Sequence, residues 1–177
     1  MSSKNYLSIY AKSFNWAGFF LPKKTYKNCS YLYDFCRVVD NIADDEGEIE
    51  IKKIKFQKFV SDFKQKNFEN PVIQNMWNII HEFNISLEII YDLFDGIESD
   101  IKQNVKIDTR KDLLIYCYRV AGTVGLMMAK ILKVSKKQSL KSAIDLGIAM
   151  QLTNISRDVI EDSKKNRSYI NGNFEEI

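Results

Sequence analysis

The chain has 177 residues, of which 45% are hydrophobic and 12% are aromatic, so a disordered chain is excluded and one packed domain is expected. Its 26 basic and 23 acidic residues are intermixed and leave a formal charge of only +3, which argues against a nucleic-acid-binding face. Cys29, Cys36 and Cys117 are odd in number and far apart, so we interpret them as buried thiols rather than a zinc site or a disulfide framework.

The pattern of apolar residues predicts no membrane span. Residues 1–10 lack the continuous apolar run of a signal peptide, and the most apolar later stretch, 120–129, is too short to cross a bilayer. We therefore expect a single domain over residues 1–177 that is cytoplasmic, with at most a peripheral association with the inner membrane. The pattern carries no signal for an oligomeric state.

The first predicted helix follows Pro22 and covers about 23–45, with Gly47 after its end. Its apolar residues recur at three- and four-residue steps and predict a buried stripe made of Leu32, Phe35, Val39 and Ile42. The same spacing places a second, polar set on one helical face beside this stripe: Tyr33, Arg37, Asp40 and Asp44.

Three further amphipathic helices are expected at about 49–66, 71–83 and 87–101. The first of these is rich in lysine, and its inward side is predicted to carry Ile51, Ile54, Phe59 and Phe63. Pro71 suits the first position of the second helix. The segment 100–109 is polar and is expected to be a loop.

Two long helices are predicted to complete the chain, at about 110–133 and 136–165. Thr109 with Asp112, and Ser135 with Gln138, resemble capping boxes at their starts, the second more faithfully. No segment has the alternation of a strand, and no repeat or low-complexity tract occurs. The predicted fold class is all-α.

The last of these helices repeats the polar arrangement of the first. Its three- and four-residue steps align Gln151, Asn154, Asp158 and Asp162, with Arg157 at the flank. A solvated helical face is the commoner explanation for one such acidic pair. The alternative is that both helices serve one site, since carboxylate and amide oxygens without Cys or His suit Mg²⁺ rather than a soft metal.

The use of arginine favours this second interpretation. The chain has only five arginines against 21 lysines, yet Arg37 and Arg157 stand beside the two acidic pairs. A guanidinium binds diphosphate oxygens through two parallel hydrogen bonds, which an ammonium cannot do. Two acidic helices that face each other, with arginines at their flanks, would form a site for metal ions and a diphosphate.

Glycine and aromatic residues leave alternatives open. Gly122 and Gly125 inside a predicted helix either allow close packing of a neighbouring helix or open room for a long apolar ligand. Four aromatic residues either line such a tunnel or fill the core, and core is the default: Phe14, Phe19, Tyr116 and Tyr118.

These segments resemble the squalene/phytoene synthase family. Residues 33–45, YDFCRVVDNIADD, resemble its first aspartate-rich motif, and residues 149–162, AMQLTNISRDVIED, its second, followed by Arg167 and Tyr169. Ser13–Phe14 and Leu21–Pro22 match its N-terminal pattern. Residues 116–128, YCYRVAGTVGLMM, resemble the bacterial and plant phytoene synthases more than the eukaryotic squalene synthases.

The resemblance implies an all-α isoprenoid synthase fold, a helical bundle around a central cavity. It also implies Mg²⁺, or Mn²⁺ in its place, as cofactor, with NADPH not expected. The implied metal-binding and catalytic residues are Asp40, Asp44, Asp158 and Asp162, with Asn154 as a further metal ligand. The implied diphosphate-binding residues are Tyr10, Ala11, Lys12, Ser13, Tyr33, Arg37, Gln151 and Arg157. The implied pocket for the substrate tail contains Phe14, Tyr118, Val124 and Gly125.

The implied substrates are prenyl diphosphates, and the implied reaction joins two geranylgeranyl diphosphates head to head, through a cyclopropyl diphosphate, to phytoene. This reaction opens carotenoid biosynthesis. The alternatives are a squalene or dehydrosqualene synthase that acts on farnesyl diphosphate, and a non-catalytic truncated relative that serves as an interaction module.

The sequence departs from the family pattern at three points. Asn41 stands where many members have a second adjacent aspartate, and Tyr10 and Ala11 stand where some relatives have His and Ser. The chain also ends soon after the second motif, whereas members continue for several more helices. We therefore expect it to lack the C-terminal helices of the fold, and to be poorly active or inactive alone.

Overall fold

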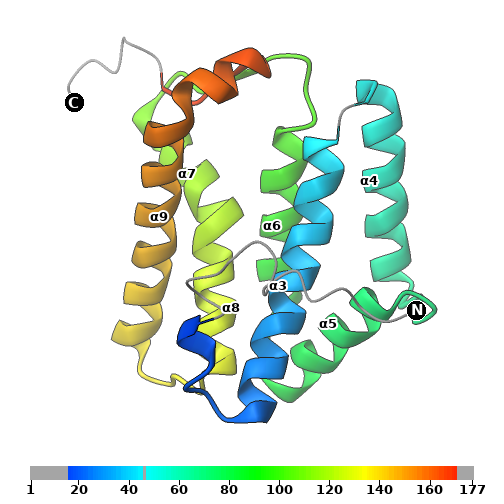
Figure 1. The fold of residues 1–177 in the computed structure, drawn as a ribbon, viewed down its shortest axis with the longest axis vertical. Coiled ribbons are helices and arrows are strands. Elements are labelled where there is room, and N and C mark those ends of the chain that lie inside the picture. The colour runs from blue at the N-terminus through cyan, green and yellow to red at the C-terminus, as the bar shows by residue number, and fades with distance from the viewer. Residues whose placement is uncertain (1–15, 46, 171–177) are drawn as a thin grey trace.

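The computed structural model describes residues 16–45 and 47–170, and these form a helical assembly (Figure 1). Its helices are α3 (Lys23–Asp44), α4 (Ile49–Lys64), α5 (Pro71–Glu82), α6 (Leu87–Ser99), α7 (Arg110–Cys117), the π-helical segment η1 (Tyr118–Gly122), α8 (Thr123–Ile131) and α9 (Lys137–Lys164). Two short strands, β1 (Val105–Lys106) and β2 (Arg167–Ser168), pair in parallel. The predicted all-α class is confirmed. The strand pair lies partly in the predicted loop, and two residues are too few to show alternation.

Pro71 and Thr109 mark helix starts as predicted, whereas Ser135 does not. Pro71 occupies the first position of α5, and the Oγ1 atom of Thr109 accepts a 3.0 Å hydrogen bond from the Asp112 amide at the start of α7. The predicted cap at Ser135 is wrong, because α9 begins at Lys137 after Lys136 and has no side-chain cap.

The predicted inward side of α4 is wrong in part. Phe59 and Phe63 are buried as expected, but Ile51 and Ile54 are 47% and 64% exposed. The buried stripe continues instead through Phe56, which lies three residues before Phe59 on the same face. An aromatic ring buries more apolar surface than an isoleucine and therefore sets which side of the helix faces the core.

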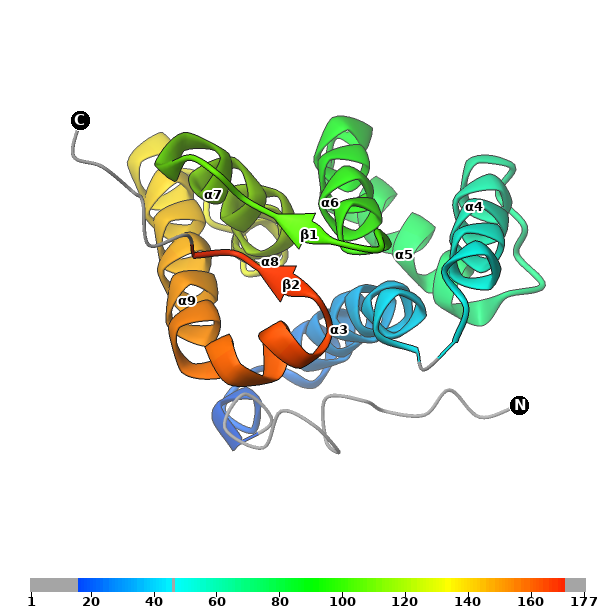
Figure 2. The same ribbon diagram turned by 90° about the horizontal axis from the view of Figure 1, so that it is seen from above.

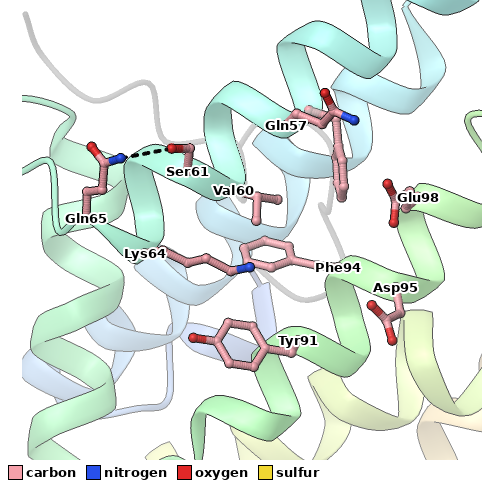
Figure 3. A pocket seen from close by; sticks show the side chains of 10 residues that line it. Gln57, Val60, Ser61, Lys64, Gln65, Tyr91, Phe94, Asp95 and Glu98 are labelled. Atoms are coloured by element: carbon pink, nitrogen blue, oxygen red, sulfur yellow. Dashed lines mark hydrogen bonds between the residues drawn. The ribbon is translucent and has the colours of Figure 1, made fainter.

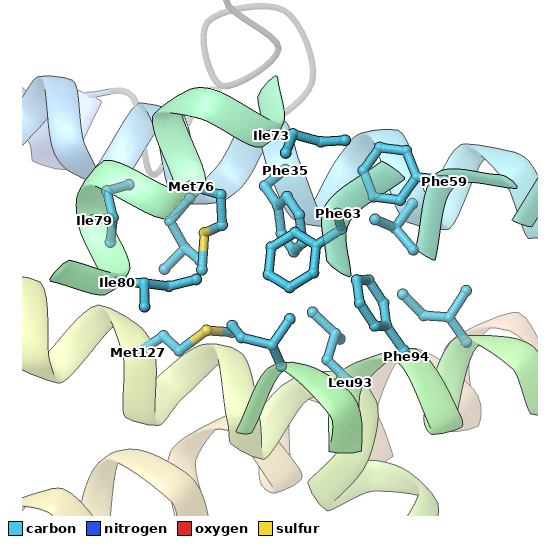
Figure 4. Close-up of a cluster of buried hydrophobic side chains, with 14 of the residues drawn as sticks. Phe35, Phe59, Phe63, Ile73, Met76, Ile79, Ile80, Leu93, Phe94 and Met127 are labelled. Atoms are coloured by element: carbon cyan, nitrogen blue, oxygen red, sulfur yellow. The ribbon is translucent and has the colours of Figure 1, made fainter. Parts of the chain in front are cut away.

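The main core lies between α3, α4, α5 and α6 (Figure 4). Phe35 and Phe63 are fully buried at its centre, and Phe94 of α6 contacts both rings, with centroid distances of 6.0 and 5.4 Å. Trp77 stacks on Phe63 and donates a 3.0 Å hydrogen bond from Nε1 to the Phe63 carbonyl oxygen, so its polar atom is satisfied inside the core. This core fixes α3 and α6, the two helices that carry one side of the candidate site.

The stretch Arg110–Ile131 is helical throughout and includes η1. By length and composition alone it could cross a membrane, but interior helices of soluble proteins pass the same test. In this structure the stretch packs against α6 and α9.

Two glycines mark close contacts with α9. A Cβ added at Gly125 would lie 2.3 Å from the Ala143 carbonyl oxygen, and one added at Gly147 would lie 2.4 Å from that of Ala121. Gly125 could either allow close helix packing or open room for an apolar ligand, and the structure shows close packing against α9 at this residue.

The C-terminal ends of α3, α6 and α9 lie at the same end of the molecule, where β1 and β2 run side by side (Figure 2). Asn166, with a φ of 55°, ends α9 in the left-handed conformation and turns the chain into β2. The Val105 and Ile107 amides then donate to the Asn166 and Ser168 carbonyl oxygens. A second buried cluster lies at this end: Val105, Ile107, Leu113, Tyr116, Cys117, Ile155 and Tyr169.

Candidate functional site

Three helices end with an acidic residue at this end of the molecule. Asp44 is the last residue of α3, Asp100 caps α6, and Asp162 lies in the last turn of α9. The C-terminal end of a helix carries a partial negative charge, so a carboxylate there is unfavourable unless a cation lies nearby. Neither α3 nor α6 has a basic residue in its last turn. The ends of these helices therefore form a region that favours bound cations.

Arg167 supplies one such cation. Its Nη1 atom donates a 2.8 Å hydrogen bond to Asp44, and its Nη2 atom donates to the carbonyl oxygens of Ala43 at 3.2 Å and of Asp100 at 3.5 Å. Its side chain is only 11% exposed. The guanidinium thus donates to backbone carbonyl oxygens at the ends of two helices and to one carboxylate. Its planar arrangement of N–H donors allows all these hydrogen bonds at the same time.

A cavity of about 230 Å³ lies beside this region. Its polar lining includes Tyr33, Arg37 and Asp40 from α3 and Gln151 from α9. Its apolar lining is formed by Leu93 and Ile97 of α6 and Val120 of η1, with Cys36, Asp100 and Tyr116 completing the wall. The structure therefore brings together four of the predicted site residues from helices more than 100 residues apart in the chain, next to an apolar surface.

Arg37 stabilises the charged form of Asp40. The Nη1 atom of Arg37 donates a 2.8 Å hydrogen bond to Asp40, one turn later on α3. Desolvation raises the pKa of Asp40, the nearby Asp44 raises it further, and Arg37 and Arg167 lower it. Burial also raises the pKa of Cys36 to about 12, with a contribution from Asp40, so this thiol is protonated at neutral pH.

Asp100 is a partly buried carboxyl group in the same cavity wall. It accepts hydrogen bonds from the Tyr169 hydroxyl at 2.7 Å and the Tyr116 hydroxyl at 2.8 Å. Desolvation raises its pKa to about 6 from an ordinary 3.8, although the two hydroxyls and Arg167 oppose the rise. The Tyr116 and Tyr169 rings stack with their centroids 4.8 Å apart.

The acidic residues of α9 are not gathered with Asp40 and Asp44 into the single site that the sequence predicts. Asp158 is half-exposed and forms a two-point ion pair with Arg157, with distances of 2.7 and 2.6 Å, which lowers the Asp158 pKa. Asn154 lies 3.5 Å from the Gln151 side-chain oxygen. Asp162 lines a second groove with Arg167, and this groove shares no lining residue with the cavity that contains Asp40.

The two acidic helices nevertheless influence each other. Desolvation and Asp158 raise the pKa of Asp162, Asp44 of α3 also raises it, and Arg167 lowers it. Among the residues that the structure describes, no three Asp, Glu, His or Cys side chains are close enough together to form a metal site. The expected single cluster is thus not formed here, and Arg167 is bound to Asp44 between the two helices.

The donor set still fits Mg²⁺. All the predicted ligands offer oxygen, which hard cations prefer, and the side chains of Asp44 and Asp162 are close enough for like-charge repulsion to raise the pKa of Asp162. A divalent ion between the helices would relieve that repulsion. Asp40, Asp44, Asn154, Asp158 and Asp162 remain the predicted ligands.

The predicted tail-pocket residues are dispersed. Tyr118 donates a 3.0 Å hydrogen bond to Asp92 of α6, Val124 packs against the main core, and Gly125 contacts α9. Tyr10, Ala11, Lys12, Ser13 and Phe14 lie outside the described residues. The tail pocket and the N-terminal diphosphate contacts therefore remain predictions.

A groove of about 520 Å³ lies away from these carboxylates, between α4 and α6 (Figure 3). Lys64 and Gln57 of α4 face Tyr91, Asp95 and Glu98 of α6 across it. It is larger than the cavity at Asp40, but its described lining includes none of the predicted site residues, so its size alone does not make it the functional site.

Sequence reasoning missed the role of Asp100 and left Arg167 and Tyr169 as motif residues without contacts. Asp100 lies at the end of the predicted helix 87–101, next to the polar segment 100–109, and an acidic residue at such a place has no feature that distinguishes it. The only local clue for Arg167 was the scarcity of arginine. The strand pair that joins these segments brings together residues about 60 positions apart, and neither local propensity nor periodicity predicts such a pairing.

Comparison with known proteins identifies relatives over most of the chain. The family model described as squalene/phytoene synthase matches residues 7–172. A phytoene synthase from Pseudescherichia vulneris is 32% identical over 172 residues, which cover 90% of this chain and 55% of the relative. A 4,4'-diapophytoene synthase from Staphylococcus haemolyticus is 33% identical over 165 residues, which cover 90% of this chain and 58% of the relative.

Solved structures of related synthases have a similar fold. A dehydrosqualene synthase crystallised with a ligand is 30% identical, with a TM-score of 0.75 over 94% of this chain and 59% of that one. A squalene synthase from Alicyclobacillus acidocaldarius, at 22% identity, a TM-score of 0.74 and coverage of 91% of this chain and 61% of that one, shows the same fold. The chain thus spans between 55% and 61% of the length of these four relatives.

Proposed function

This chain belongs to the squalene/phytoene synthase family, and from that premise we propose that it carries the catalytic face of a phytoene synthase. The reaction would join two geranylgeranyl diphosphates head to head, through a cyclopropyl diphosphate, to phytoene. The observation that carries the proposal is the cavity in which Tyr33, Arg37, Asp40 and Gln151 meet an apolar wall. Such a boundary suits a substrate with a charged head and a long hydrocarbon tail.

The polar side of the cavity would bind the diphosphate group. Arg37 and Gln151 offer N–H donors and Tyr33 a hydroxyl, all placed on helices that the core or the close α8–α9 contact holds rigid. The predicted ligands Asp40, Asp44, Asn154, Asp158 and Asp162 would hold Mg²⁺, which when bound would stabilise the negative charge of the departing diphosphate. Donors that are in place before the reaction stabilise that charge without further reorganisation.

The apolar side of the cavity would protect the cation that is left when the diphosphate departs. Leu93, Ile97 and Val120 offer no group that reacts with an allylic cation and would exclude water from it. The double bond of the second substrate would then attack the cation, and loss of a proton from the carbocation that results would close the ring of the cyclopropyl diphosphate. Ionisation of this intermediate, rearrangement and loss of a proton would give phytoene.

Substrate length separates this proposal from its main alternative. The Staphylococcus haemolyticus relative, a 4,4'-diapophytoene synthase, is as similar to this chain as the Pseudescherichia vulneris phytoene synthase is. A shorter tail pocket would suit farnesyl diphosphate and give squalene or dehydrosqualene. We favour the longer substrate because the segment 116–128 resembles the bacterial and plant phytoene synthases.

A product assay separates these outcomes. The protein would be incubated with Mg²⁺ and either geranylgeranyl or farnesyl diphosphate, each with and without NADPH, and the hydrocarbons identified by mass spectrometry. Since the chain is expected to be poorly active alone, the proposal predicts a small amount of phytoene from the longer substrate, without any need for NADPH. Squalene or dehydrosqualene formed from farnesyl diphosphate, with no phytoene, would assign the chain to the alternative.

A further inference from the structure

We propose that Asp100, Tyr116, Arg167 and Tyr169 form a clasp that positions Asp44 and holds the ends of α3, α6 and α9 in register. Within the clasp, Arg167 contacts Asp44 and Tyr169 holds the segment that carries Arg167, so these two are proposed as positioning residues, while Asp100 and Tyr116 also line the cavity at Asp40. The clasp itself stands on the contacts within the chain, and only its effect on Mg²⁺ rests on the proposed function.

The carboxyl group of Asp100 is the centre of the clasp. Each of its two oxygens accepts a hydrogen bond from a different tyrosine hydroxyl, Tyr169 at 2.7 Å and Tyr116 at 2.8 Å. Tyr116 belongs to α7 and Tyr169 follows β2, so one carboxyl group at the end of α6 joins two other segments. With both oxygens engaged by hydroxyl donors, the role that the geometry supports for Asp100 is to hold these segments together.

Arg167 extends the clasp to α3. Its guanidinium binds Asp44 and Ala43 of α3 and reaches the Asp100 carbonyl oxygen of α6. The neighbouring β1–β2 hydrogen bonds, from Val105 and Ile107, hold the backbone on either side of Arg167. Movement of the segment 167–169 would therefore carry Arg167 away from Asp44.

The stacked rings make the clasp rigid. Tyr116 and Tyr169 pack face to face and are buried with Ile155 of α9 in the second cluster. Their hydroxyls share one acceptor residue, which fixes the orientation of both rings. The rotation of Asp44, a predicted Mg²⁺ ligand, is thereby linked to a buried cluster that contributes no ligand itself.

Amide hydrogen exchange tests the clasp without metal or substrate. In the 177-residue chain, the Val105 and Ile107 amides are expected to exchange slowly, because both donate to the β2 segment. Tyr169→Phe, which keeps the ring, and Arg167→Gln are each expected to speed this exchange about tenfold, because each removes hydrogen bonds of the clasp. The matched controls are Tyr91→Phe and Arg110→Gln, at exposed positions outside the clasp. Exchange at Val105 and Ile107 that stays unchanged in both clasp variants, with core amides still protected, would overturn the clasp.

The positioning role is tested by the Mg²⁺ dependence of inorganic pyrophosphate binding. Arg167→Gln is expected to raise the half-saturating Mg²⁺ concentration about tenfold, with Arg167→Lys in between because it keeps the charge but not the fork. An unchanged Mg²⁺ requirement in Arg167→Gln, with faster exchange at Val105, would refute the positioning role. A wild-type chain that binds no pyrophosphate at any Mg²⁺ concentration would instead overturn the proposed function, and with it the link to Mg²⁺, while the exchange result would still decide the clasp.

Discussion

Arg167 donates a 2.8 Å hydrogen bond to Asp44, a residue 123 positions earlier in the chain. This contact joins the segment after the second acidic motif to the last residue of the helix that carries the first. Without a cation at this point, the carboxylates of Asp44 and Asp162 would repel each other at the negative ends of two helices. The two motifs, far apart in the sequence, thus share one electrostatic environment.

The buried carboxyl of Asp100 should make stability depend on pH. Burial raises the pKa of Asp100 to about 6 from 3.8, so the folded protein binds more protons than the unfolded chain between these values. Its contribution is fully present below about pH 4 and is lost as pH rises through 6. Between pH 4 and 7 the wild type should lose at most about 3 kcal/mol of unfolding free energy relative to Asp100→Asn. Urea unfolding at several pH values measures this difference, and parallel pH profiles of the two proteins would contradict the assignment.

The contacts of α9 with α8 and with η1 should tolerate no added side-chain atom. Gly125→Ala and Gly147→Ala would each bring a Cβ within about 2.5 Å of a carbonyl oxygen on the opposite helix, so the helices must separate. Each substitution should cost about 1–3 kcal/mol of unfolding free energy. Gly47→Ala is the matched control, because nothing lies within 4 Å of a Cβ at that position. Equal thermal stability of the three variants would show that these contacts are looser than described.

The main core should depend strongly on Phe94. This ring contacts Phe35, Phe56, Phe59 and Phe63, so Phe94→Ala would remove contacts with all of them and leave a cavity. The expected loss is about 3–5 kcal/mol of unfolding free energy. Chemical denaturation followed by circular dichroism measures it. Phe68→Ala, at a position that is 46% exposed, should cost much less.

The helix caps offer a direct test of where α7 and α9 begin. Thr109→Ala removes a side-chain acceptor for the Asp112 amide and should cost about 1 kcal/mol. Ser135→Ala should change the unfolding free energy little, because α9 begins without a side-chain cap. If Ser135→Ala lowered the unfolding free energy more than Thr109→Ala does, the result would support the cap that the sequence predicts at Ser135 and contradict the structure.

The helices themselves could be predicted because their signals are local. Pro71, Thr109 and the apolar periodicity of α3 each act within a few residues. The structure confirms both helix starts and the burial of Leu32, Phe35 and Val39, while Ile42 is only partly buried. The exposed Ile51 and Ile54 show the limit of this reasoning. Several helical faces of α4 carried apolar residues, and only the aromatic packing with α3 and α6 selects one of them.

Some residues of the cavity could be predicted from the sequence, but their contacts could not. Spacing on one helix aligns Tyr33, Arg37 and Asp40, and all three line the cavity. Spacing does not show that Arg167 pairs with Asp44 or that two tyrosines converge on Asp100, since both depend on the β1–β2 pairing. Loop closure over long separations leaves no local pattern, which is why the clasp is visible only in three dimensions.

The most direct test of the account is calorimetric titration of inorganic pyrophosphate into the chain with and without Mg²⁺. Binding should require Mg²⁺ and should weaken at least about tenfold in Asp40→Asn and in Asp162→Asn, because each loses a charged oxygen ligand. Asp145→Asn, an exposed aspartate on α9, should bind like the wild type. Pyrophosphate binding that is absent, or that is equally strong in all three variants, would contradict a shared site between α3 and α9.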